Sequence, residues 1–266
     1  MLLKLIYIEH KKTRKSFAFW LTIFGTMVIP AIFFLVMLIK PEKFTYPEMI
    51  NPWKMLFTHT FIAVSSFLFP MYVIYLIGLL ANIEYKSNNW KKLFVLPIRK
   101  ELLISGKLLY VLLNVFLAVV LFALYVLLFG CLVGLIHPEL KLLSALPDFT
   151  LVTQLIYHLF LALLGIVMFQ FLLSMFFENI LITLAAGLFL TVGSIIAAGF
   201  EWEYIHWIPY AGPLNFSSTV EALVGKNPAK DVVQGFGLKT YEMINLGYFA
   251  LVFAVCLYFF KRKTVK

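Results

Sequence analysis

The chain is short of charge. Only 13% of its 266 residues are Asp, Glu, Lys or Arg, while 62% are hydrophobic. Charged residues alone reach about a quarter of an ordinary soluble domain, so this composition excludes that class. Cysteine is also scarce: Cys131 and Cys256 both lie inside apolar runs, which excludes an extracellular disulfide framework. We interpret both as small apolar packing residues.

Motifs of enzymes and of nucleotide binding are missing as well. The sequence has no HExxH pair and no Gly-x-Ser-x-Gly elbow, and its His, Cys, Asp and Glu residues do not gather at metal-ligand spacing. Gly106-Lys107 and Gly225-Lys226 are followed by Leu108 and Asn227, not by the Ser or Thr of a phosphate-binding loop. We therefore predict a chain that is not an enzyme and binds no metal or cofactor itself.

Long apolar runs make up most of the sequence. Six of them are long enough to cross a hydrocarbon core, which takes about 20 helical residues. The pattern predicts an all-α integral membrane protein, with one transmembrane domain over residues 1–266. We expect its six transmembrane helices near residues 17–39, 58–80, 108–136, 151–176, 179–200 and 243–260.

The segment before the first run, residues 1–16, is apolar at its start and basic afterwards, from Lys11 to Lys15. A signal peptide would place its charge first and follow it with a short apolar core and a cleavage site. The order seen here instead favours an amphipathic helix that lies on the cytoplasmic face of the membrane.

The distribution of basic residues predicts the orientation in the membrane. Of the 22 Lys and Arg residues, 15 fall on the side that holds both termini and seven on the other side. The positive-inside rule makes the first side cytoplasmic. The net charge of +9 gathers next to apolar runs, so we interpret it as orientation charge and expect no nucleic-acid partner.

A segment rich in both basic and apolar residues, Glu84 to Lys107, lies between the second and third runs. It carries six basic residues, and Trp90, Leu93, Phe94 and Leu96-Pro97 recur at about one-turn spacing. Such a segment can lie along a membrane face and still offer charges and an aromatic ring to a cytosolic partner. Together with the order of the six runs, it resembles the cytoplasmic loop of ABC-2 type permeases, the membrane subunits of one class of ABC transporters.

In ABC-2 permeases this loop forms a coupling helix that docks on an ATPase. The resemblance covers most of the chain, and it implies a separate cytosolic ABC ATPase that binds ATP and Mg²⁺. It also implies a second permease copy or a homologous permease, and a prokaryotic cytoplasmic membrane. An ordinary basic interfacial loop is the alternative, although Pro97 and the Trp/Leu register go beyond what charge placement requires. The implied ATPase contacts are Glu84, Trp90, Leu93, Phe94, Leu96, Pro97, Ile98 and Arg99, with Lys107 at the start of the third helix.

The long segment before the last run is rich in aromatic residues and resembles the short external or re-entrant helices of ABC-2 permeases. Aromatic rings favour the headgroup level, and Pro interrupts a helix. These residues either anchor the segment or form an external gate: Trp202, Tyr204, Trp207, Pro209 and Tyr210.

Polar residues inside the runs are few. Asn114, His158 and Gln170 either form interhelical hydrogen bonds or line a pathway. The runs hold essentially no ionisable residue, so a carrier driven by protons or ions is not indicated. Energy is then expected to enter through a partner protein.

Three functional hypotheses follow. The first is the permease subunit of an ATP-driven exporter, and the size of the chain resembles the small exporters of peptide antibiotics, lantibiotic self-protection and drug efflux. The second is a non-transporting membrane anchor or sensor that recruits a cytosolic protein through residues 84–107. The third, an intramembrane enzyme, would require Asn114, His158 and Gln170 to share one hydrated pocket.

Overall fold

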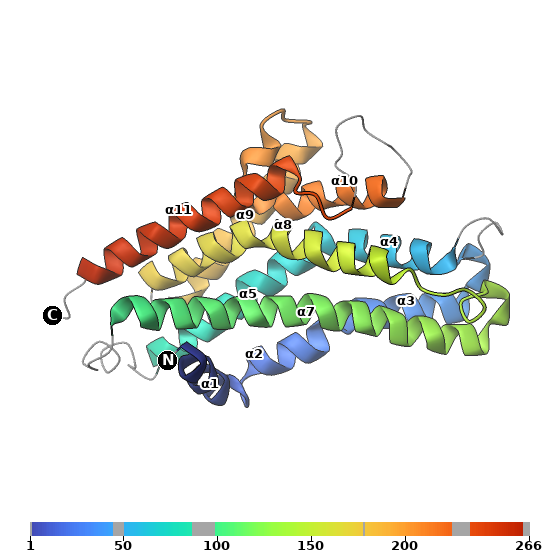
Figure 1. Ribbon diagram of the computed structural model, residues 1–266, viewed down its shortest axis with the longest axis horizontal. Coiled ribbons are helices and arrows are strands. Elements are labelled where there is room, and N and C mark those ends of the chain that lie inside the picture. Colours follow the sequence, from blue (N-terminus) through green and yellow to red (C-terminus); the bar gives the residue numbers. More distant parts are fainter. Residues whose placement is uncertain (1, 45–50, 87–98, 178, 225–234, 263–266) are drawn as a thin grey trace.

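The protein is a long bundle of helices in a computed structural model that describes residues 2–44, 51–86, 99–177, 179–224 and 235–262. No strand occurs among these residues. The helices run roughly along the long axis, and both ends of the chain lie at the same end of the bundle (Figure 1). This arrangement agrees with an even number of membrane crossings.

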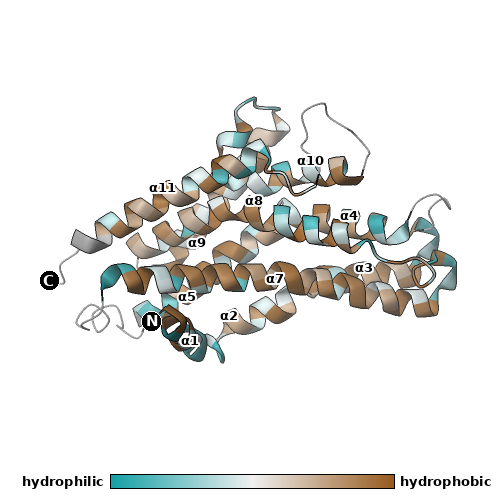
Figure 2. Ribbon diagram, in the orientation of Figure 1, coloured by the Kyte–Doolittle hydropathy of each residue, from teal (hydrophilic) through white to brown (hydrophobic). Residues whose placement is uncertain are grey.

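Six helical spans in the described residues are long and apolar enough to cross a membrane, which confirms the predicted fold class. Figure 2 shows hydrophobic ribbon along the middle of the bundle and more hydrophilic ribbon toward its two ends. The first span, Phe17–Ile39, comprises α2 (Phe17–Trp20), the π-helical turn η1 (Leu21–Gly25) and α3 (Val28–Ile39). The others are α5 (Leu68–Lys86), α7 (Lys100–Ile136), α8 (Phe149–Phe176), α9 (Ile180–Gly199) and α11 (Thr240–Arg262).

Proline residues interrupt the first two predicted helices. A proline inside a helix clashes with the carbonyl group four residues earlier and lacks an N–H. Pro30 and Pro70 lie in the first turns of α3 and α5, so the clash falls at Thr26 and Ser66, outside both helices. The run predicted over 58–80 is accordingly divided into α4 (Pro52–Ser65) and α5.

Asx residues begin several helices. Asn51 accepts a hydrogen bond from the Trp53 backbone N–H at the start of α4, and Asn179 accepts one from Leu181 at the start of α9. Asp148 accepts from both Thr150 and Leu151 at the start of α8. These side chains satisfy backbone donors that have no partner within the helix.

Helix α7 begins at Lys100, eight residues before the start predicted from hydropathy. The added residues include Lys100, Glu101 and Lys107, which lower the hydropathy but are good helix formers. Lys107 therefore lies inside the third transmembrane helix and not at its first residue.

Helix α8 lies at the centre of the bundle, where it packs against α5, α7, α10 (Gly212–Val224) and α11. It is largely buried, whereas only about a fifth of the residues are buried in α9, α11 and the Phe17–Ile39 span. Shorter elements complete the described fold: α1 (Leu2–Thr13), η2 (Pro41–Phe44), η3 (Pro138–Leu140), η4 (Ile205–Trp207) and η5 (Pro209–Ala211).

Candidate functional site

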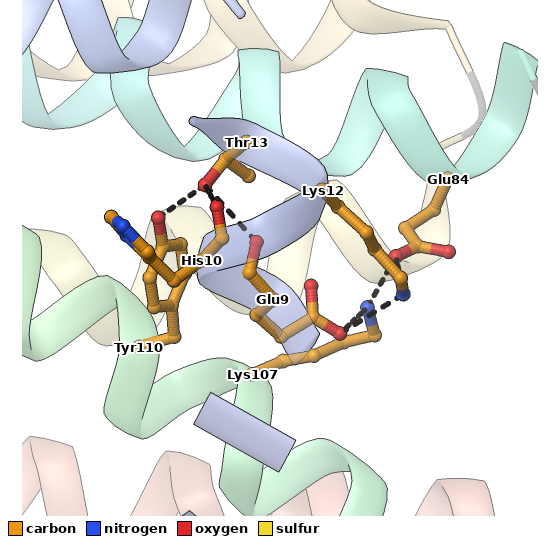
Figure 3. Close-up of polar contacts among 7 residues, drawn as sticks. All are labelled: Glu9, His10, Lys12, Thr13, Glu84, Lys107 and Tyr110. Atoms are coloured by element: carbon orange, nitrogen blue, oxygen red, sulfur yellow. Dashed lines mark hydrogen bonds and ion pairs between the residues drawn. The ribbon is translucent and has the colours of Figure 1, made fainter. Parts of the chain in front are cut away.

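Four charged side chains from three helices meet at the end of the bundle that holds the termini, in what we call the ion cluster: Glu9 and Lys12 of α1, Glu84 of α5 and Lys107 of α7. The Lys107 ammonium lies 2.7 Å from Glu84 Oε1 and 2.9 Å from Glu9 Oε1. The Lys12 ammonium lies 3.0 Å and 3.3 Å from the same two oxygens. The charges thus alternate around a closed ring, as Figure 3 shows.

The position of α1 against α7 brings this cluster together. A Cβ atom added to Gly106 would lie 3.0 Å from Leu5 Cβ, so glycine allows the two helices to approach closely here. About two turns further along α1, the Thr13 and Tyr110 hydroxyls form a buried hydrogen bond. Leu5, Glu9 and Thr13 are spaced four residues apart and therefore share one face of α1.

The cluster is electrostatically balanced, with two carboxylates and two ammonium groups. Burial alone would lower the pKa of Lys12, but the carboxylates of Glu9 and Glu84 raise it above its ordinary value. A raised lysine pKa stabilises the fold at neutral pH, and this contribution is lost only as the pH rises through the raised pKa. Lys12 therefore carries its positive charge at physiological pH.

The structure describes only some of the predicted ATPase contacts. Glu84 is buried, with 3% of its surface exposed, and faces the other members of the ion cluster. Arg99 is the exposed N-cap residue of α7. Trp90, Leu93, Phe94, Leu96, Pro97 and Ile98 lie outside the described residues.

Asn114, His158 and Gln170 do not share a pocket. Asn114 donates to the Tyr110 carbonyl on its own helix, and Gln170 donates to the Thr183 carbonyl of α9. His158 is bonded elsewhere, to Glu242 and to the Gly235 carbonyl. Each of the three residues has its own partners, so the arrangement required for an intramembrane enzyme is absent from the described structure.

The expectation that the spans hold essentially no ionisable residue is wrong. Glu242 lies in the first turn of α11 and is fully buried against His158. Hydropathy starts the predicted run at Met243, one residue after Glu242, because a carboxylate lowers the average. A helix can nevertheless carry a buried carboxylate when hydrogen-bond donors surround it.

The aromatic residues before α11 have different environments. Trp202, Tyr204 and Trp207 are about half exposed, and Pro209 begins η5. Tyr210 is buried and donates a hydrogen bond to Gln170 Oε1. Burial raises the pKa of the Tyr210 phenol, which therefore stays protonated as a donor. The structure thus separates Tyr210, which joins η5 to α8, from the exposed rings.

Gly212, the first residue of α10, provides a second close contact with α8. A Cβ atom added to Gly212 would overlap the Ala162 carbonyl oxygen and the Asn245 amide nitrogen. We expect Gly212→Ala to destabilise the protein by about 1–3 kcal/mol, because backbone at this contact must shift. Gly193→Ala is the matched control, since nothing lies within 4 Å of the added atom. Thermal unfolding of both variants in detergent checks this prediction, and equal midpoints would contradict it.

Several members of these contacts were not recognised in the sequence, chiefly Glu9, Lys12 and Glu242. Glu9 and Lys12 are three residues apart, a spacing that pairs opposite charges on one helix face and could have marked them. No sequence signal links them to Glu84 and Lys107. Among the described residues, no group of three or more His, Cys, Asp or Glu side chains could hold a metal ion.

Comparison with known proteins gives one family. The model of the family described as ABC-2 family transporter protein matches residues 5–194, which is more than half of the chain. No curated protein matches it. The matched range includes all four residues of the ion cluster and ends within α9, before η4, η5 and α10.

Proposed function

The chain belongs to the ABC-2 transporter family, and from that premise we propose that it is the permease subunit of an exporter coupled to a separate cytosolic ATPase through residues 84–107. Membership supports a membrane permease of an ABC transporter, and permeases of this family work with an ABC ATPase. Export, cytoplasmic termini, a prokaryotic inner membrane and a second permease copy are parts of the proposal. ATP and Mg²⁺ would bind to the partner.

The observation that carries the coupling proposal is the ion cluster. Residues 87–98 join the end of α5 to the start of α7, and Glu84 and Lys107 lie on these two helices, 2.7 Å apart. Glu9 and Lys12 bind both of them from α1. The two ends of the proposed coupling segment are thereby fixed to each other and to α1. A force applied to this segment would therefore reach three helices together.

This geometry changes the role that we propose for Glu84 and Lys107. Their side chains bind each other, so we propose that they position the coupling segment and do not themselves contact the ATPase. Trp90, Leu93, Phe94, Leu96, Pro97, Ile98 and Arg99 remain the proposed contacts.

Replacing Trp90 and Leu93 together by alanine is expected to weaken ATPase association on the order of tenfold or more, because buried aromatic anchors dominate most interfaces. The measurement is co-purification of the ATPase from native cells with the tagged chain, followed by ATP-driven transport in proteoliposomes. Trp20→Ala with Leu135→Ala is the control, since both side chains are exposed and lie outside the segment.

If the tagged chain recovers no ATPase, or if the Trp90/Leu93 variant binds and transports normally, the coupling proposal is wrong. The alternative function is a membrane anchor or sensor that recruits a cytosolic protein. Vectorial movement of substrate that depends on ATP hydrolysis is expected only of the permease.

A further inference from the structure

A second polar site lies in the other half of the bundle, away from the termini. His158 of α8 and Glu242 of α11 are both completely buried, and His158 Nδ1 lies 2.6 Å from Glu242 Oε1. The two residues are 84 positions apart in the sequence. Neither belongs to the ion cluster, and the proposed coupling does not use them.

Both residues also hold the segment that leads into α11. His158 Nε2 lies 2.8 Å from the Gly235 carbonyl oxygen, and Glu242 Oε2 accepts a 2.8 Å hydrogen bond from the Lys239 backbone N–H. Glu242 Oε1 accepts a third hydrogen bond from the Tyr241 hydroxyl. The His158–Glu242 pair thus joins the segment Gly235–Lys239 to the central helix.

These contacts determine how many protons the pair carries. A carbonyl oxygen can only accept, so His158 Nε2 must carry a hydrogen. A neutral imidazole has only one N–H, and its Nδ1 would then direct a lone pair at a carboxylate oxygen 2.6 Å away. That contact is attractive only if a further proton lies between the two atoms, on the imidazole or on the carboxyl group.

We propose that His158 and Glu242 form a proton-binding site, and that its proton fastens the segment Gly235–Lys239 to α8. With the proton bound, both ring nitrogens of His158 take part in hydrogen bonds. Loss of the proton leaves two lone pairs facing each other, and the attraction becomes repulsion. The segment then loses one of the two side chains that hold it.

The surroundings of the pair contain three other titratable groups among the described residues. The Tyr157 ring meets His158 edge-on at 5.0 Å between centroids, and Tyr241 donates to the carboxylate. The Lys239 side chain is buried, and burial lowers the pKa of its ammonium while the Glu242 carboxylate opposes this effect. Among the described residues, Lys239 Nζ has no hydrogen-bond partner. The short contact to the Glu242 carboxylate is therefore made by His158 Nδ1 and not by the lysine.

Nuclear magnetic resonance of the full chain in nanodiscs tests the proton count. The five histidines are labelled with ¹⁵N and the glutamates with ¹³C, and His158→Gln and Glu242→Gln identify the two signals. At pH 8, where most free histidine is neutral, we expect either a doubly protonated His158 ring or a protonated Glu242 carboxyl group. A neutral ring beside an ionised carboxylate would overturn the proposal. His206→Gln is the control and should leave both signals in place.

Amide hydrogen exchange of residues 235–242, corrected for the intrinsic pH dependence, tests whether the proton holds the segment Gly235–Lys239 against α8. In the wild type we expect protection to fall by about tenfold per pH unit once the proton is lost, as linkage to one proton requires. Glu242→Gln should stay protected at every pH, because its amide can donate to Nδ1 without a titrating proton. His158→Leu should be unprotected throughout. If wild-type protection stays constant while the proton is lost, the proton does not hold this segment, and that part of the proposal is refuted.

Discussion

Replacing Lys107 by methionine is expected to destabilise the protein by about 3–5 kcal/mol and to uncouple ATP hydrolysis from transport. Methionine keeps the length of the side chain but removes the ammonium group that lies 2.7 Å from Glu84 and 2.9 Å from Glu9. The Glu84 side chain is only 4% exposed, so water cannot replace the lost interaction, and the carboxylates of Glu84 and Glu9 are left to share the single ammonium of Lys12. Removing one partner of a buried ion pair usually has an effect of this size.

The double variant Glu84→Gln with Lys107→Met separates a buried unpaired charge from the loss of a specific contact. We expect it to recover most of the lost stability, since the one remaining carboxylate of the ion cluster, Glu9, is then matched by the one remaining ammonium, Lys12. Lys15→Met is the control, because Lys15 is exposed. The measurements are the thermal midpoint in nanodiscs and the transport per ATP hydrolysed in proteoliposomes. A stable, fully coupled Lys107→Met protein would refute the role of the ion cluster.

Trp53→Ala is expected to cost about 3–5 kcal/mol of stability, as truncation of a buried aromatic ring usually does. Trp53 is 1% exposed and its ring lies against Gly130 of α7. Its indole N–H donates to the carbonyl oxygens of Leu142 and Ala145, at 2.7 and 3.2 Å. The substitution therefore leaves a cavity and removes the donor that holds the connection between α7 and α8.

Trp202→Ala provides the comparison, because the Trp202 side chain is about half exposed. Thermal unfolding monitored by size-exclusion chromatography should show a large fall in the midpoint for Trp53→Ala and little change for Trp202→Ala. Similar midpoints for the two variants would show that the connection between α7 and α8 contributes little to stability.

The six spans could be predicted from the sequence because the length of an apolar run is a local property. A membrane helix needs about 20 apolar residues, and each run supplies them. The interruptions at Thr26 and Ser66 were also within reach, since Pro30 and Pro70 lie four residues further on. Hydropathy predicts the start of α7 too late, because it follows apolar character, while the helix continues through the charged residues Lys100, Glu101 and Lys107.

The polar contacts could not be predicted in the same way. Glu84 and Lys107 lie 23 residues apart on different helices, and His158 and Glu242 lie 84 apart. Their meeting depends on how the helices pack, and one sequence does not specify that packing. Hydropathy also works against such residues, because it assigns a charged side chain near a span to the outside. For this reason hydropathy leaves Glu242 outside the predicted run 243–260, although it lies in the first turn of α11.

Helix α7 has a mechanical consequence for the whole molecule. Its 37 residues contain no proline and form one unbroken helix, about 55 Å long, which exceeds the roughly 30 Å hydrocarbon core. Lys107 lies near one end, and the connection bound by Trp53 follows the other. If α7 moves as a rigid body, a tilt of about 10° around its midpoint moves each end by roughly 5 Å in opposite directions. A displacement at one membrane surface is thereby reproduced, with reversed sign, at the other.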